Sequence, residues 1–66
     1  MGELIENQRV ESMDYFDLVL DLEVTTSTYK VYEEYEDGTE CEDPMFFNEY
    51  EEANNYFDNF ITYYKG

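Results

Sequence analysis

The sequence predicts a small α+β domain in which an antiparallel meander of two to three strands packs against one C-terminal helix. Three observations support this fold class. Residues 15–24 alternate between apolar and polar side chains, an Asp37-Gly38 pair separates two strand-like runs, and residues 46–65 gather aromatic side chains on one helical face. A length of 66 residues suits one domain and no more. We therefore expect residues 1–66 to form a single acidic unit.

Residues 1–13 suit either a short helix or an extended lead-in, since Leu4, Ile5 and Val10 fit both. The strand that follows is clearer, because a period of two is typical of a half-buried β-strand. One face of this strand is wholly apolar and comprises Phe16, Leu18, Leu20, Leu22 and Val24. The other face carries three acids, Asp17, Asp21 and Glu23, which we expect to meet water or a partner.

The antiparallel strands are expected within residues 15–42. Residues 29–36 are rich in Tyr and Val and predict a second strand, with Tyr29, Val31 and Tyr35 turned inward. Asp37-Gly38 predicts a hairpin with a type I′ turn. Residues 39–42 would form a short third strand, ended by Pro44 because proline cannot donate to a ladder.

Residues 46–65 predict a helix. At about 100° per residue the aromatic positions fall on one side, and this face comprises Tyr50, Ala53, Phe57, Phe60, Ile61 and Tyr64, with Phe46 added if the helix begins that early. Asn48 is the expected N-cap, with Glu51 three residues on as in a capping box. Lys65 and Gly66 suit the C-terminal end.

The charge of the chain is unusual for a folded domain. Eighteen acids face only Arg9, Lys30 and Lys65, which gives a net charge of −15, whereas solubility needs a magnitude of only about 2–8. Apolar residues make up 42% and aromatic residues 20%, which is too apolar for a disordered acidic tail. The excess of acid therefore indicates an acidic surface on a fold, or adaptation to high salt.

Catalytic, cofactor and metal sites are not expected. The chain has no histidine, the commonest general base, and the acids around Cys41 disfavour a reactive thiolate. The best calcium-loop frame, residues 33–44, has Gly38 at the sixth position but Tyr35 and Pro44 where ligands are required. An acidic N-terminus, a lone cysteine and no long apolar run lead us to expect a cytoplasmic protein away from membranes.

A basic protein surface is the expected partner. Three scattered cations cannot form the positive groove that direct nucleic-acid binding needs. The candidate partner-binding acids form three groups: Asp17, Asp21 and Glu23 on the first strand; Glu33, Glu34, Glu36, Asp37, Glu40, Glu42 and Asp43 along and beside the hairpin; and Glu49 and Glu52 on the helix. Tyr56 and Tyr63, seven residues apart on one helix stripe, either anchor an arginine-rich partner or complete the core.

In these features the chain resembles small phage-encoded inhibitors of host DNA-acting proteins. The likeness lies in overall character: no histidine, acids on a strand face, the Asp37-Gly38 hairpin and the acidic aromatic stretch from Asn48 to Phe57. Such inhibitors include DNA mimics among the anti-CRISPR, anti-restriction and uracil-DNA glycosylase inhibitor proteins. The resemblance implies an inhibitor in the host cytoplasm that occupies the basic channel of a nuclease or other DNA-binding protein and blocks nucleic acid.

Two other functions stay open. One is a non-mimic interaction module or small regulator that binds through an aromatic patch. The other is a structural protein whose acidity is adaptation to salt. A thin core and an exposed strand edge also leave homodimerisation open.

Overall fold

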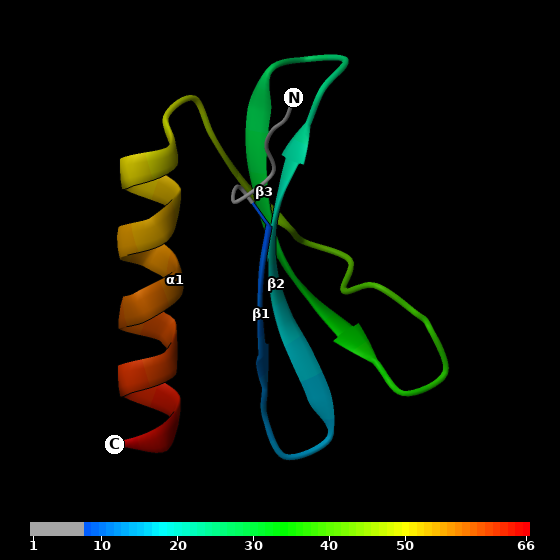
Figure 1. The fold of residues 1–66 in the computed structure, drawn as a ribbon. Coiled ribbons are helices and arrows are strands. Elements are labelled where there is room, and N and C mark those ends of the chain that lie inside the picture. The colour runs from blue at the N-terminus through cyan, green and yellow to red at the C-terminus, as the bar shows by residue number, and fades with distance from the viewer. Residues whose placement is uncertain (1–7) are drawn as a thin grey trace.

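The computed structural model describes residues 8–66 and shows one antiparallel sheet with a helix along one face (Figure 1). The elements in chain order are β1 (Arg9–Ser12), β2 (Phe16–Glu23), β3 (Thr28–Tyr35), β4 (Met45–Phe47) and α1 (Tyr50–Lys65). The strands lie side by side in the order β1-β2-β3-β4. The α+β class and the single C-terminal helix are therefore confirmed, but the sheet has four strands rather than two to three.

The period-two pattern of β2 is confirmed. Its apolar face turns toward α1, and three of its residues are buried there: Phe16, Leu18 and Leu20. β3 pairs with β2 over all eight residues of each strand, with Leu20 opposite Val31. Val31 is buried, and Tyr29 and Tyr35 pack against the same core, as expected. Val24 lies beyond the end of β2 and is 79% exposed.

Residues 9–12 of the expected lead-in form a strand, β1, rather than a helix. Residues 9–12 are extended and pair antiparallel with β2, with Val10 opposite Val19. Leu4 and Ile5 fall outside the described residues. The alternation that marked β2 is missing from β1, because its helix-facing positions are the charged residues Arg9 and Glu11.

Ionic contacts hold β1 to the helix in place of apolar ones. The Arg9 guanidinium lies 4.4 Å from the centre of the Phe57 ring and donates to Asp58 at 3.0 Å. Lys65 Nζ donates to Glu11 at 2.7 Å. Two of the three cations of the chain thus bridge β1 and α1, on the side of the sheet away from its open face.

The turn after β3 differs from the type I′ turn that we expected. The Gly38 N–H donates to the Tyr35 carbonyl at 2.9 Å, and the Tyr35 N–H donates to the Thr39 carbonyl at 2.8 Å. Gly38 has a φ of 90°, whereas Glu36 and Asp37 do not have positive φ. This is the three-residue hairpin loop closed by a glycine bulge, in which only the last residue needs the left-handed region.

The expected third strand at residues 39–42 is wrong. Only one bridge forms there, between Glu34 and Glu40, before the chain leaves the sheet. Pairing with β3 resumes at β4, so Pro44 precedes a strand rather than ending one. Phe46 lies in β4 and not on the helix, because its backbone pairs with Lys30.

The helix begins at Tyr50, four residues later than expected, because the preceding residues belong to β4. Its N-cap is Glu49, which is extended and makes no side-chain capping bond, so the prediction of Asn48 as N-cap is wrong. The expected C-terminal end is confirmed, with Lys65 in the last turn and the Gly66 N–H donating to the Thr62 carbonyl at 2.8 Å.

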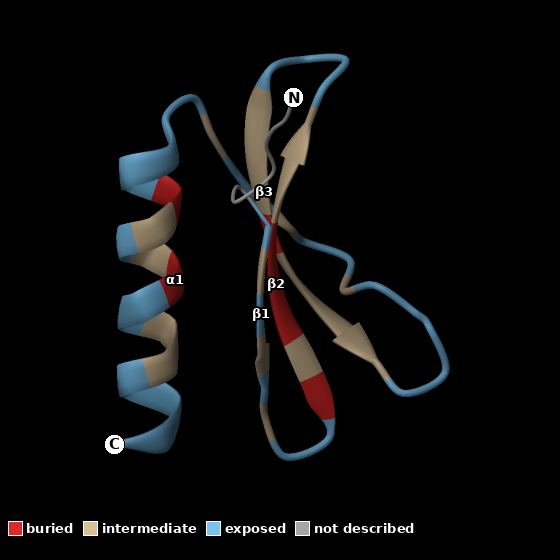
Figure 2. Cartoon of the chain, in the orientation of Figure 1, coloured by how far each residue is buried: buried red, intermediate tan, exposed pale blue. Residues whose placement is uncertain are grey.

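The core lies between β2, β3 and α1, as the buried positions in Figure 2 show. From the helix it receives Ala53 and Phe57, both buried, with Phe60 and Ile61 partly buried beside them. Tyr50 and Tyr64, also expected on this face, lie at its margins and are each 36% exposed. One small core on one side leaves the other side of the sheet for contact with solvent or a partner.

Candidate functional site

The open face of the sheet carries a patch of acids that we call the outer acidic face. The helix covers the opposite face, and no described element covers this one (Figure 1). Strand pairing places five acids on it: Asp17, Asp21 and Glu23 of β2, Glu34 of β3, and Glu40, which is bridged to Glu34. The first three confirm that the acids of β2 share one side of the strand, away from the core.

Three of these acids lie in a row across the sheet. Asp17 is directly opposite Glu34, and Glu34 is directly opposite Glu40. Neighbouring strands are about 4.7–4.9 Å apart, and like charges directly opposite each other destabilise a sheet. The fold therefore retains an unfavourable arrangement at this position, which is typical of residues that serve a function rather than stability.

A small apolar centre interrupts the acids. Val19 is only 3% exposed although it lies on the outer face. Its register neighbours are Val10 on β1, which is 56% exposed, and Tyr32 on β3, which is half-buried. Burial, followed by the charges of Glu40 and Glu34, raises the pKa of Tyr32. The apolar surface beside the acids is therefore supplied by Val10 and Tyr32, since Val19 is itself buried.

Lys30 is the cation of this face. Its Nζ donates to Glu40 at 2.8 Å and lies 4.6 Å from the centre of the Tyr32 ring. The hydrogen bond to Glu40 raises the pKa of Lys30, against the opposing effect of burial. Within residues 8–66, the salt bridges engage Glu40 here and Glu11 and Asp58 on the helix side.

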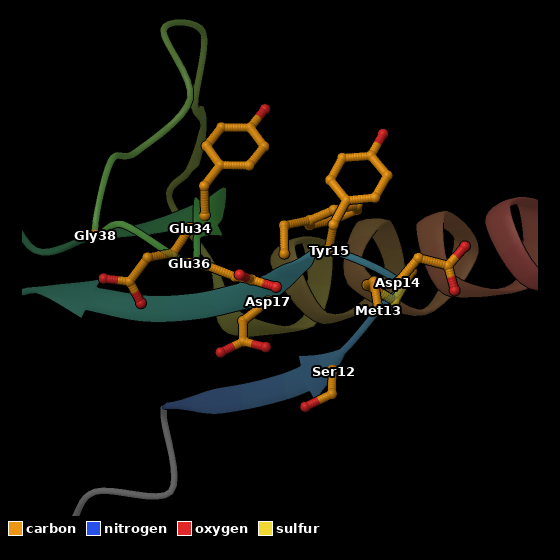
Figure 3. Close-up of a pocket in the computed structure, with 10 residues that line it drawn as sticks. Ser12, Met13, Asp14, Tyr15, Asp17, Glu34, Glu36 and Gly38 are labelled. Carbon is orange, nitrogen blue, oxygen red and sulfur yellow. The ribbon is translucent and has the colours of Figure 1, made fainter.

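An open depression of about 420 Å³ adjoins the row of acids at one end of the sheet (Figure 3). We call it the sheet-end depression. The connection between β1 and β2 forms one wall and the turn after β3 forms the other. Carboxylates and tyrosine rings line it together, and they belong to Asp14, Tyr15, Asp17, Glu34, Tyr35 and Glu36.

The acids of the hairpin do not form one cluster. Glu34 and Glu40 join the outer acidic face, whereas Glu33 faces the helix side and accepts from the Tyr35 hydroxyl at 2.9 Å. That hydrogen bond raises the pKa of Tyr35. The remaining hairpin acids are exposed at the turn or in the segment before β4, and they are Glu36, Asp37, Glu42 and Asp43.

The acids and tyrosines of the helix lie apart from the outer acidic face. Glu49 and Glu52 are exposed at the start of α1, on the other side of the sheet. Tyr56 is half-buried, with its ring centre 5.4 Å from that of Phe47, whereas Tyr63 is 91% exposed. The structure therefore separates the two tyrosines that the sequence suggested as a pair: Tyr56 packs on the core, and Tyr63 stands in solvent.

Tyr15 and Asp14 are site residues that the sequence did not single out. Tyr15 is 61% exposed beside the depression, and Asp14 accepts from the Tyr64 hydroxyl at 3.3 Å. Both lie in the connection between β1 and β2, whereas the sequence placed Tyr15 at the start of the first expected strand and gave Asp14 no role. The exposed aromatic residue flanked by acids was the signal that could have marked this position.

Comparison with known proteins gives no relative. No family model, no curated protein and no solved structure matches the chain.

Among residues 8–66, no three acidic or cysteine side chains are grouped so that they could hold a metal ion. The helix described here also lacks the length and the apolar character that a bilayer-crossing helix needs.

Proposed function

We propose that this protein is an acidic inhibitor that binds the basic nucleic-acid-binding groove of a DNA-acting protein and blocks access of the nucleic acid. One observation carries the proposal. A sheet face that no element of residues 8–66 covers presents Asp17, Glu34 and Glu40 in register. Two of the three cations are bound on the opposite side, and the third, Lys30, pairs with Glu40 alone.

The geometry suits a surface made to receive arginine and lysine. Carboxylates and phosphates are both anions that accept paired hydrogen bonds from arginine. Alternate residues along a strand are about 6.8 Å apart and neighbouring strands about 4.8 Å apart, so the sheet sets the spacing between the acids. Because the sheet fixes the backbone of these acids, little backbone freedom remains to be lost on binding.

The total charge supports the same function kinetically. A net charge of −15 attracts a basic groove from a distance, which accelerates association and makes it sensitive to salt. The same charge opposes contact between two copies of the chain. It therefore favours a basic partner over the homodimer that the exposed strand edges left open.

The proposal is tested by capture from a bacterial lysate with three immobilised forms of the full chain. The first is the wild type. The second, the outer-face variant, carries Asp17→Asn, Asp21→Asn and Glu34→Gln. The third, the helix variant, loses the same amount of charge through Glu49→Gln, Glu51→Gln and Glu52→Gln. Circular dichroism first establishes that all three are folded. Retained proteins are then eluted with duplex DNA.

We expect the wild type and the helix variant to retain a DNA-binding protein that duplex DNA displaces, and the outer-face variant to lose it. Retention should weaken between about 0.1 M and about 1 M salt, as the Debye length falls from about 10 Å to about 3 Å. The proposal is wrong if no DNA-binding protein is retained at either salt. It is equally wrong if the two variants lose the same protein to the same extent, since net charge rather than the outer face would then explain capture. Loss on Tyr63→Ala alone would instead identify an aromatic-patch module.

A further inference from the structure

The sheet-end depression has the dimensions of a site for one side chain. Its volume of about 420 Å³ is at the lower end of the range for small-ligand sites, and it is too small for a helix or a duplex. Two turns that are distant in sequence form its walls, Met13–Tyr15 and Glu36–Gly38. Each turn follows a paired strand, so the sheet fixes both walls.

Negative charge is concentrated around this depression. Figure 3 shows the carboxylates of Asp17, Glu34 and Glu36 near one another, with Asp14 at the far side. The salt bridges described above engage none of these four acids. Asp17 and Glu34 also face each other directly across β2 and β3, where like charges are unfavourable. A cation in the depression would relieve this repulsion.

Aromatic rings complete the walls and are held in place by the core. The Tyr15 ring is 61% exposed and meets Phe16 edge-on, with 5.4 Å between ring centres. Tyr35 contacts Phe16 from another side at 6.2 Å, and its hydroxyl donates to Glu33. Phe16 itself is 6% exposed. The exposed ring of Tyr15 therefore rests on a buried one and offers a prepared stacking surface.

From this combination we infer that the sheet-end depression binds one arginine side chain of the basic partner. The inference rests on the proposed function and deepens it by naming the residue type that enters this site. A guanidinium is planar, stacks on aromatic rings and carries five donors. Its donors point in several directions, so it can bind carboxylates that surround a depression even though these carboxylates do not point at one common position. A lysine ammonium is a compact, strongly hydrated charge that gains less from the ring.

The test uses the full chain labelled with ¹⁵N and two probe peptides of equal length and charge, one rich in arginine and one rich in lysine. Binding is followed by NMR titration and by calorimetry at low salt. We expect the arginine peptide to bind about twofold to fivefold more tightly than the lysine peptide, which is the size of one cation–π contact at an exposed ring. Its largest shifts should fall in residues 13–17 and 34–38.

Substitutions in the sheet-end depression test which residues cause the preference for the arginine peptide. Tyr15→Ala should abolish the preference for arginine, whereas Tyr15→Phe, which keeps the ring, should retain it. The pair Asp17→Asn and Glu34→Gln should weaken the arginine peptide several-fold more than the pair Glu51→Gln and Glu52→Gln, which removes equal charge from the helix. Equal affinity for the two peptides, or a preference that survives Tyr15→Ala, would overturn the inference.

The outcomes separate this inference from the proposed function. If the chain displaces DNA from a captured protein but prefers neither peptide, the arginine site is wrong and the inhibitor function stands. If the arginine peptide binds at the depression but no DNA-binding protein is captured, the arginine site stands and the inhibitor function is wrong.

Discussion

Asp17 and Glu34 lie directly opposite each other on β2 and β3, and this pair predicts that Asp17→Asn makes the protein more stable. Two carboxylates about 6 Å apart repel by about 0.7 kcal/mol at the dielectric constant of water. For a domain of this size, 1 kcal/mol shifts the melting temperature by about 4–8 °C. We therefore expect Asp17→Asn to raise the melting temperature by about 3–6 °C at low salt, measured by circular dichroism.

A matched control separates the local pair from the total charge. Glu51→Gln changes the net charge by the same amount, but Glu51 lies in the first turn of α1, where the helix dipole favours a negative charge. Its melting temperature should stay constant or fall. The gain from Asp17→Asn should shrink in about 1 M salt, where the Debye length is about 3 Å. If both variants raise the melting temperature equally, repulsion over the whole chain is responsible, and the reasoning from strand register is refuted.

Three further predictions concern the fold that carries the acids. Phe57 is 1% exposed in the core, so Phe57→Ala should lower the free energy of unfolding by about 3–5 kcal/mol; a urea midpoint near that of the wild type would contradict this. Gly38 has a φ of 90° and free space around it, so Gly38→Ala should be destabilising by about 1–2 kcal/mol through backbone strain alone, and an unchanged urea midpoint would argue against the glycine bulge. Hydrogen bonds from Thr39 lower the pKa of Asp37 from its ordinary value of 3.8. The stabilisation from this carboxylate is therefore present above that value and is lost as pH falls through the folded pKa, so the difference in melting temperature between wild type and Asp37→Ala should close in acid; a difference independent of pH would contradict it.

The sequence predicted those strands and helices whose own residues repeat apolar side chains with the period of a strand or of a helix. β2 alternates except at Val19, and the helix spaces its aromatic residues at one turn, so both could be recognised without knowledge of their partners. β1 could not, because Arg9 and Glu11 occupy its helix-facing positions and are satisfied by Asp58 and Lys65. Those partners lie more than 40 residues away, and no local pattern shows the pairing.

The boundary between β4 and α1 also could not be predicted from the neighbouring residues alone. Phe46 fits the helical period of the residues that follow it, yet its backbone pairs with Lys30 in the sheet. Tertiary pairing therefore overrides the local preference. The same holds for the site: the acids of β2 could be assigned to one side of a strand, whereas the sheet-end depression exists only because two distant turns meet beside Tyr15.

The most direct test of the account is competition between this chain and DNA for the captured protein. Fluorescence anisotropy of a labelled duplex bound to that protein is measured as the chain is added. We predict that the wild type and the helix variant displace the duplex, and that the outer-face variant, with equal net charge to the helix variant, does not. Simultaneous binding of duplex and wild-type chain, or equal displacement by both variants, would contradict the claim that the outer acidic face takes the place of nucleic acid.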